Sequence, residues 1–255
     1  MTRTHGKALR VAALAMFLAS LAACASTTPP ADPAARAEFE RTNDPYEPFN
    51  RRMFAFNLWV DDNVAKPVAI AYRDNIPKFV RDRFRDFYDN FNAPVTFIND
   101  VLQGESGRAA ETATRFWVNT VFGMAGFWDV AGGYGLKKHK EDFGQTLAVW
   151  GVKEGPFLMI PFLGPSNVRD AAGKVVDSFS NPISYYLPAG GAYLEIVAGI
   201  VDKVDERAGL IEPIDELRRT SLDFYAAVRS LYRQSRESEI SNGKVKKPPL
   251  PGEDE

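Results

Sequence analysis

The sequence predicts an all-α fold that contains one apolar, hairpin-like loop. Most segments between residues 44 and 236 repeat apolar residues at helical spacing, and Gly and Pro divide them into helices of about 10 to 20 residues. Strand and helix patterns do not alternate, and no internal repeat occurs. The exception is segment 151–165, which is apolar and holds three prolines, so it does not suit a regular helix.

The amino terminus has the pattern of a lipoprotein signal. Residues 1–23 hold three basic residues and no acid, and their apolar part, 11–21, is too short to span a membrane permanently. Leu21-Ala22-Ala23-Cys24 resembles the bacterial lipobox, in which the cysteine thiol is lipidated. The alternative is an ordinary signal peptide with an incidental cysteine, but the chain's only cysteine lies where the lipobox needs it.

The mature chain begins at this cysteine and divides into three parts. We expect a lipidated, flexible tether over 24–42, a helical domain over 43–236 and a disordered tail over 237–255. Ala25 replaces the Asp that in many such lipoproteins signals retention at the inner membrane, which favours the outer membrane. Without the three basic residues of the signal, the charge balance is 28 − 33 = −5, which gives no general field for binding nucleic acid.

The first predicted helix starts after Asn43-Asp44-Pro45, runs through Val64 and stops at Pro67. Its apolar face is wider than a small core usually needs, so it is either a core helix or a helix lying in a membrane interface. The spacing alone favours the core helix. The residues that would form the interface helix are Phe49, Asn50, Met53, Phe56 and Trp59.

A second helix follows from Val80, and Pro94 is expected to end it and to start a short helix closed by Gly104. Arginines at 81, 83 and 85 project from the second helix. An arginine run either forms a solvated face or meets lipid phosphates, and the pattern favours the solvated face.

Segment 116–131 is the most apolar run after the amino terminus, and it suits either a buried helix or one partly in lipid. Gly123 and Gly126 are expected to break it. Asn119 and Asp129 are candidates for a polar inner side, with helix capping as the alternative. Asp129 would act as an acid if its pKa were raised, but the capping role is favoured.

The remaining helices are predicted from residues that cap, open or interrupt a helix. Asp142 is expected to cap a short helix, Ser166 the next one, and Pro213 to open a final helix through residue 231. The basic loop 137–140 is expected to be solvated. The hairpin-like loop must be buried or line a cavity, because its backbone lacks helical hydrogen bonds. Its candidate residues are Gly155, Pro156, Phe157, Pro161 and Gly164.

Catalytic and metal-binding motifs are scarce. After removal of the signal the chain retains one histidine, His139, and Cys24 is assigned to the anchor. Zinc sites need several His or Cys ligands, and no nucleophile-elbow or phosphate-loop motif occurs. We therefore expect no enzyme, no metal and no cofactor. A lipid hydrolase that uses Asp129 or His139 is kept as an alternative.

Several motifs, in order from residue 44 to 188, resemble the VacJ/MlaA lipoprotein family. They are the opening segment 44–57 (DPYEPFNRRMFAFN), Pro67-Val68-Ala69 with Tyr72-Arg73, Leu102-Gln103-Gly104, Arg115-Phe116, Asn119-Thr120, the segment 126–131 (GFWDVA), the segment 142–147 (DFGQTL), Gly155-Pro156 to Pro161, Gly164-Pro165-Ser166 and Arg169-Asp170. Lys153-Glu154 departs from the family, which is usually more glycine-rich there.

The resemblance implies a ring of amphipathic helices embedded in the outer membrane around a central channel. Members of the family remove misplaced phospholipids from the outer leaflet and pass them to a periplasmic lipid-carrier protein and then to an inner-membrane transporter complex. They associate with trimeric porins. The alternative function is a structural lipoprotein adaptor that scaffolds porins or other envelope partners.

Overall fold

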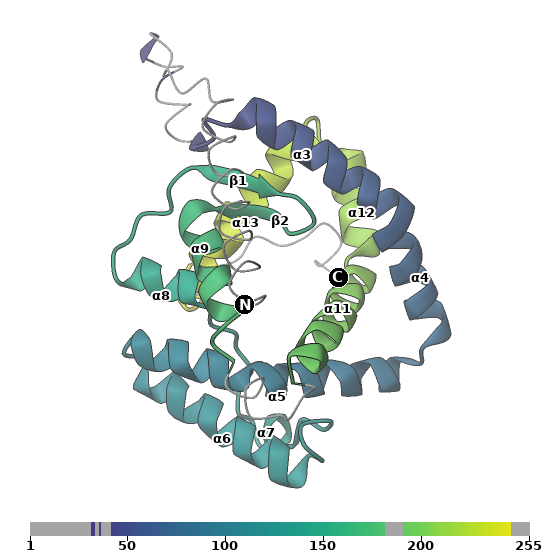
Figure 1. The fold of residues 1–255 in the computed structure, drawn as a ribbon, viewed down its shortest axis with the longest axis vertical. Coiled ribbons are helices and arrows are strands. Elements are labelled where there is room, and N and C mark those ends of the chain that lie inside the picture. The colour runs from purple at the N-terminus through teal and green to yellow at the C-terminus, as the bar shows by residue number, and fades with distance from the viewer. Residues whose placement is uncertain (1–31, 34–35, 37–41, 182–190, 246–255) are drawn as a thin grey trace, which may run out of the picture. The chain divides into compact units, whose positions relative to one another are not determined.

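The computed structural model describes residues 32–33, 36, 42–181 and 191–245. Cys24 and the signal segment 1–23 lie outside this part of the chain. The fold is mostly helical, with one two-stranded sheet (Figure 1). None of the helices in the described ranges combines the length and the apolar character that crossing a membrane requires.

The chain forms two compact units. The first, here called the hairpin unit, joins the residues up to Asn57 with Glu154–Val168; the second, the helical unit, joins Leu58–Lys153 with the residues from Arg169 onward. Each unit is therefore built from two separate stretches of sequence.

The hairpin unit contains most of helix α3 (Glu47–Val60) and strands β1 (Phe157–Ile160) and β2 (Gly164–Asn167). The strands are antiparallel, with Phe157 opposite Asn167, so the predicted hairpin is confirmed. Ser166 lies buried in β2 and does not cap a helix; the next helix, α9, starts at Val168.

Asparagine side chains of the hairpin unit bind the backbone of β1. The Asn50 amide donates to the Phe157 carbonyl (3.0 Å) and accepts from the Met159 N–H (2.9 Å). Asn57, two helical turns later, donates to the Ile160 carbonyl at 3.0 Å. Asn50 is fully buried, so the structure contradicts its assignment to an outward-facing membrane-interface surface.

The helical unit holds a π-helical turn and the remaining helices. The bounds are η1 (Asp61–Ala65), α4 (Lys66–Asn75), α5 (Lys78–Leu102), α6 (Ser106–Phe122), α7 (Val130–Gly133), α8 (Phe143–Val149), α9 (Val168–Asp177, of which Val168 belongs to the hairpin unit), α11 (Gly191–Gly209), α12 (Ile211–Thr220) and α13 (Phe224–Ile240). Contacts between α5 and α8, α8 and α13, α13 and α12, α12 and α11, and α11 and α5 close a cycle (Figure 1).

Two prolines do not end helices as predicted. Pro67 is the second residue of α4, and the chain stays helical from α3 through the π-helical turn η1 into α4. Pro94 lies inside α5, a single helix of 25 residues. Packing of α5 against α6, α8 and α11 holds it continuous, which local propensity cannot anticipate.

The predicted final helix is two helices. α12 ends at Thr220, and Asp223 caps α13 by accepting a hydrogen bond from the Ala226 N–H at 3.2 Å. α13 continues to Ile240, so helix extends into the segment predicted as a disordered tail.

The polarity of the described residues is inverted relative to a water-soluble domain. Nine hydrophobic residues are buried, against eighteen polar or charged ones. Large apolar side chains are instead exposed, including Trp117 (64%), Phe122 (74%) and Ile196 (61%). Large exposed apolar side chains are candidates for contact with a partner or a lipid surface.

Candidate functional site

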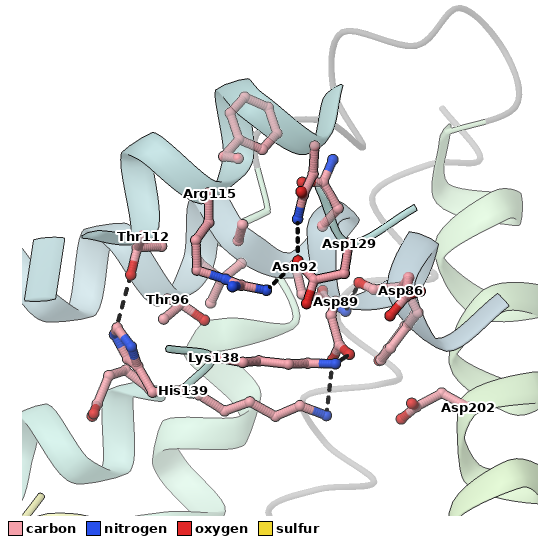
Figure 2. A pocket seen from close by; sticks show the side chains of 18 of the residues that line it. Asp86, Asp89, Asn92, Thr96, Thr112, Arg115, Asp129, Lys138, His139 and Asp202 are labelled. Carbon is pink, nitrogen blue, oxygen red and sulfur yellow. Dashed lines mark hydrogen bonds and ion pairs between the residues drawn. The ribbon is translucent and has the colours of Figure 1, made fainter. Parts of the chain in front are cut away.

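A cavity of about 290 Å³ lies inside the helical unit. Helices α5 and α6, the segment from Lys138 to Asp142 and helix α11 contribute most of its lining (Figure 2). Four apolar or aromatic residues, Tyr88, Ala93, Val95 and Phe116, share the lining with a larger set of charged and amide side chains. The site is therefore amphipathic.

One corner of the cavity is built around Asp129, which caps α7. Its carboxylate accepts from the Gly132 N–H (3.0 Å), the Arg115 guanidinium (2.7 Å) and the Asn119 amide (3.0 Å). Burial alone would raise the pKa of Asp129, but these three donors outweigh it and hold the pKa below its ordinary value. The capping interpretation is confirmed, and a raised pKa for a catalytic acid is contradicted.

A second cluster joins α5 to the basic loop. Lys138 and Lys140 both form ion pairs with Asp89, the second at 3.1 Å, and Asp89 is largely buried. Figure 2 shows the Lys138 side chain pointing toward Asp89. The lysines of this loop are exposed, as predicted, but two of them also pair with a carboxylate on another helix, which the sequence did not predict.

His139 takes part in a buried polar contact. Its Nε2 atom lies 3.0 Å from Asp100 and 3.1 Å from the Thr112 hydroxyl. In a hydrolase triad the two ring nitrogens serve different partners, one the nucleophile and the other the carboxylate. Here one nitrogen meets both groups, so the arrangement does not have the geometry of a hydrolase triad.

Arg236 of α13 joins three helices next to the cavity. Its guanidinium binds Asp142, the cap of α8, at 2.6 and 2.7 Å, and Asp170 of α9 at 2.9 and 3.1 Å. A Cβ at Gly173 would lie 2.3 Å from the Gly144 N atom, so α8 and α9 meet there at backbone contact. The motif residues 142–147 and 169–170 thus build the junction of α8, α9 and α13.

Two carboxylates of the lining have no cation as a direct partner. Asp177 accepts from the Phe143 N–H at 2.9 Å, and burial raises its pKa to about 6. Asp202 of α11 makes no hydrogen bond or ion pair within the part of the chain that the structure describes, and burial raises its pKa. Figure 2 shows it without a dashed contact.

The other predicted site residues lie apart from the cavity lining. Gly123 and Gly126 form the turn after α6: a Cβ at Gly123 would lie 2.2 Å from the Trp128 carbonyl oxygen, and Gly126 has a φ of +98°. The break in the apolar segment is thereby confirmed. Of the predicted wall residues only Asn119 and Asp129 line the cavity.

The candidate interface helix presents part of its apolar face outward. Trp59 is 61% exposed and Phe56 is 36% exposed, whereas Phe49 and Met53 are half-buried. The spacing-based preference for a core helix is therefore wrong for the exposed residues.

The arginine run is paired. Arg83 lies 3.0 Å from Asp86, and Arg85 lies 2.5 Å from Asp205 of α11, with Arg81 at 3.7 Å from the same residue. The prediction of a solvated face is wrong here, since these side chains bind carboxylates of the fold.

Sequence reasoning missed Asp89, Asp177 and Asp202. Single acids on polar helix faces carry no motif, and only tertiary structure brings them to one cavity. The run 137–140 was the available signal, because three adjacent lysines and a histidine are an unusual density of donors. Across the described ranges, no group of His, Cys, Asp and Glu has the arrangement of a metal site.

Comparison with known proteins places the chain in one family. The family profile described as MlaA lipoprotein matches residues 42–239. A protein of Escherichia coli (strain K12), the "Intermembrane phospholipid transport system lipoprotein MlaA", is 36% identical over 244 residues, covering 94% of this chain and 92% of its own. An uncharacterized protein of Rickettsia bellii is 35% identical, covering 82% of this chain and 81% of its own.

A solved structure supports the same assignment at the level of the fold. It is described as "Structural basis for maintenance of bacterial outer membrane lipid asymmetry" and superposes with a TM-score of 0.70 at 34% identity. The alignment covers 77% of this chain and 98% of the solved one. With the family profile spanning both compact units, the chain belongs to the MlaA lipoprotein family.

Proposed function

We propose that this protein removes misplaced phospholipids from the outer leaflet of the outer membrane and passes them to a periplasmic lipid carrier. The observation that carries the proposal is the inverted polarity: apolar side chains on the outside and a polar cavity inside the helical unit. A lipid crossing such a wall needs a polar route for its headgroup and apolar surroundings for its tails. No bond is made or broken, so the chemistry needs no catalytic group.

The membrane placement follows from the exposed apolar faces. In lipid, a helix with an apolar outer face and a polar inner face is stable lying in the interface, without spanning the bilayer. We propose that the cycle of contacts among α5, α8, α13, α12 and α11 forms part of a ring wall, with Asn119 and Asp129 on its polar side. Lipidation of Cys24 would anchor the protein on the periplasmic side.

The partners follow from the energetics of transfer. A passive wall equilibrates lipid but gives it no direction, so a periplasmic carrier and an energised transporter must draw lipid away. A trimeric porin would supply a rigid protein surface for some of the exposed apolar side chains. Neither partner changes the chemistry of the cavity.

The experiment is a gene deletion scored by phospholipid exposed at the cell surface. Cells without the protein are expected to expose phospholipid in the outer leaflet, and the wild-type gene should restore asymmetry. A structural adaptor predicts a different result for charged substitutions at Gly155 or Gly164 of the hairpin unit, which should then leave function intact. Unchanged surface lipid in the deletion strain would contradict the transport function.

A further inference from the structure

The charges around the cavity do not cancel locally. Most of its carboxylates have a cationic partner: Asp129 binds Arg115, Glu141 binds Arg108, Asp142 binds Arg236 and Asp86 binds Arg83. Each of these pairs has no net charge, and both of its charged groups already have a partner within the chain. They are therefore poor ligands for a charged guest. Asp177 has no cation, but its carboxylate already accepts from the Phe143 N–H and the Asn99 amide. The remaining groups decide what the cavity prefers.

The Lys138–Asp89–Lys140 cluster carries a surplus positive charge. Two ammonium groups share one carboxylate, so the cluster sums to 2 − 1 = +1. The Lys140 side chain is 67% exposed and holds Asp89 at 3.1 Å, which leaves other donor directions of its ammonium open. A phosphate diester can accept from these directions without breaking the cluster.

Asp202 supplies the opposite charge from α11. No hydrogen bond or ion pair joins it to another described residue, although Lys140 and Lys203 act on it through space. Lys203 itself is bound to Glu206 at 2.6 Å. Lys140 and Asp202 both line the same cavity, Lys140 from the basic loop and Asp202 from α11. The cavity is thus dipolar.

Resting on the proposed function, we propose that this cavity selects zwitterionic phospholipids, with the lipid phosphate at Lys138 and Lys140 and the headgroup ammonium at Asp202. A lipid with a net negative headgroup satisfies the lysines but leaves Asp202 facing an uncharged or negative group. Charge-assisted hydrogen bonds are stronger than neutral ones, so the ammonium contact sets the preference.

The test uses the full lipidated chain, purified in detergent and equilibrated with vesicles of equal phosphatidylethanolamine and phosphatidylglycerol, followed by mass-spectrometric counting of the bound lipid. We expect phosphatidylethanolamine to exceed phosphatidylglycerol by about five- to tenfold, the size of one partly buried charge-assisted contact. Asp202→Asn should bring the ratio to about one. Asp202→Glu should keep the preference.

Two further variants separate the parts of the argument. Asp74→Asn, a matched change of an exposed aspartate outside the cavity, should leave the ratio as in the wild type. Lys140→Gln should lower the bound amounts of both lipids. The ratio of phosphatidylethanolamine to phosphatidylglycerol should stay as in the wild type, because Asp202 is retained. Thermal unfolding of each variant verifies that the fold is retained.

The outcomes distinguish this inference from the transport function. A wild-type ratio near one, or an Asp202→Asn ratio equal to that of the wild type, overturns the headgroup preference while lipid binding stands. Phosphatidylcholine that binds no better than phosphatidylglycerol would also contradict it. The headgroups of phosphatidylcholine and phosphatidylethanolamine both carry a cation. A wild-type protein that retains no lipid at all refutes the proposed function and this inference with it.

Discussion

The junction of α8, α9 and α13 and the outer face of α11 are stabilised in opposite ways. The junction holds Arg236, the partly exposed Asp142 and the buried Asp170 in an ion-pair network with closely specified geometry. The face of α11 presents Ile196 and Ile200 at 61% and 59% exposure. The first region depends on directional polar contacts within the chain, and the second depends on the solvent around it.

This difference teaches that the usual hydrophobic core is a minor source of stability here. The core cluster of the helical unit consists of Ala69, Ala208 and Ile211, which is small for a protein of this length. Specific hydrogen bonds and ion pairs must therefore define the fold, because apolar burial within the chain is limited. Variants of the two regions should separate fold stability from membrane affinity.

The largest loss of stability is expected for Arg236→Met. Removing the guanidinium takes the cation from the partly exposed Asp142 and one of two cations from the buried Asp170, which keeps Arg169; the loss of these charge-assisted contacts costs about 3–5 kcal/mol. Chemical denaturation followed by circular dichroism measures the change. Arg219→Met, which removes an exposed pair with Glu216, is the control and should change little. Equal effects of the two would show that the junction is not a source of stability.

A smaller loss is expected for Asn50→Ala in the hairpin unit. The change leaves the Met159 N–H and the Phe157 carbonyl without their side-chain partner, for about 2–3 kcal/mol. Hydrogen exchange at the Met159 amide should accelerate, whereas Asn75→Ala, at an exposed helix end, should leave that amide protected. A Met159 amide that exchanges at the wild-type rate would contradict the role of Asn50.

The double change Ile196→Ser and Ile200→Ser tests the other side of the comparison. Both side chains are already exposed, so the melting temperature should stay within about 2–4 °C. Partition into vesicles should fall at least about tenfold, because two apolar side chains no longer enter lipid. A Cys24→Ser background prevents the anchor from masking the loss. Partition equal to that of the parent would exclude α11 from the membrane face.

The smallest effect concerns pH. The pKa of Asp177 is raised to about 6 by burial, so the folded state binds this proton more tightly than the unfolded state does. Its contribution to stability is therefore full at low pH and declines as pH rises from about 4 through 6. Asp177→Asn should flatten this decline in melting temperature between pH 4 and pH 7, and Asp215→Asn, an exposed control, should not. Parallel curves for wild type and Asp177→Asn would refute the assignment.

The features that could be predicted from the sequence depend on contacts between residues close together in the chain. The Asp142 cap depends on the N–H of Gln145, three residues away, and the turn at Gly123 and Gly126 depends on backbone geometry that glycine permits. The hairpin follows from prolines that exclude a helix. These features can be read in a window of a few residues.

The features that could not be predicted depend on contacts between residues far apart in the chain. Arg236 finds Asp142 at a separation of 94 residues, and Arg85 finds Asp205 at a separation of 120. Lys138 and Lys140 were interpreted as solvated because Asp89 lies on another helix. Pro94 stays within α5, a helix that packs against three neighbouring helices. No local pattern contains such information.

The asparagine contacts along β1 also protect the molecule from association. An open strand edge is a template on which another chain can add a strand and begin to aggregate. The Asn50 side chain occupies one donor and one acceptor of the β1 backbone, so a passing polypeptide finds fewer groups to pair with. A chain that already exposes large apolar side chains gains from having one strand edge less open to association.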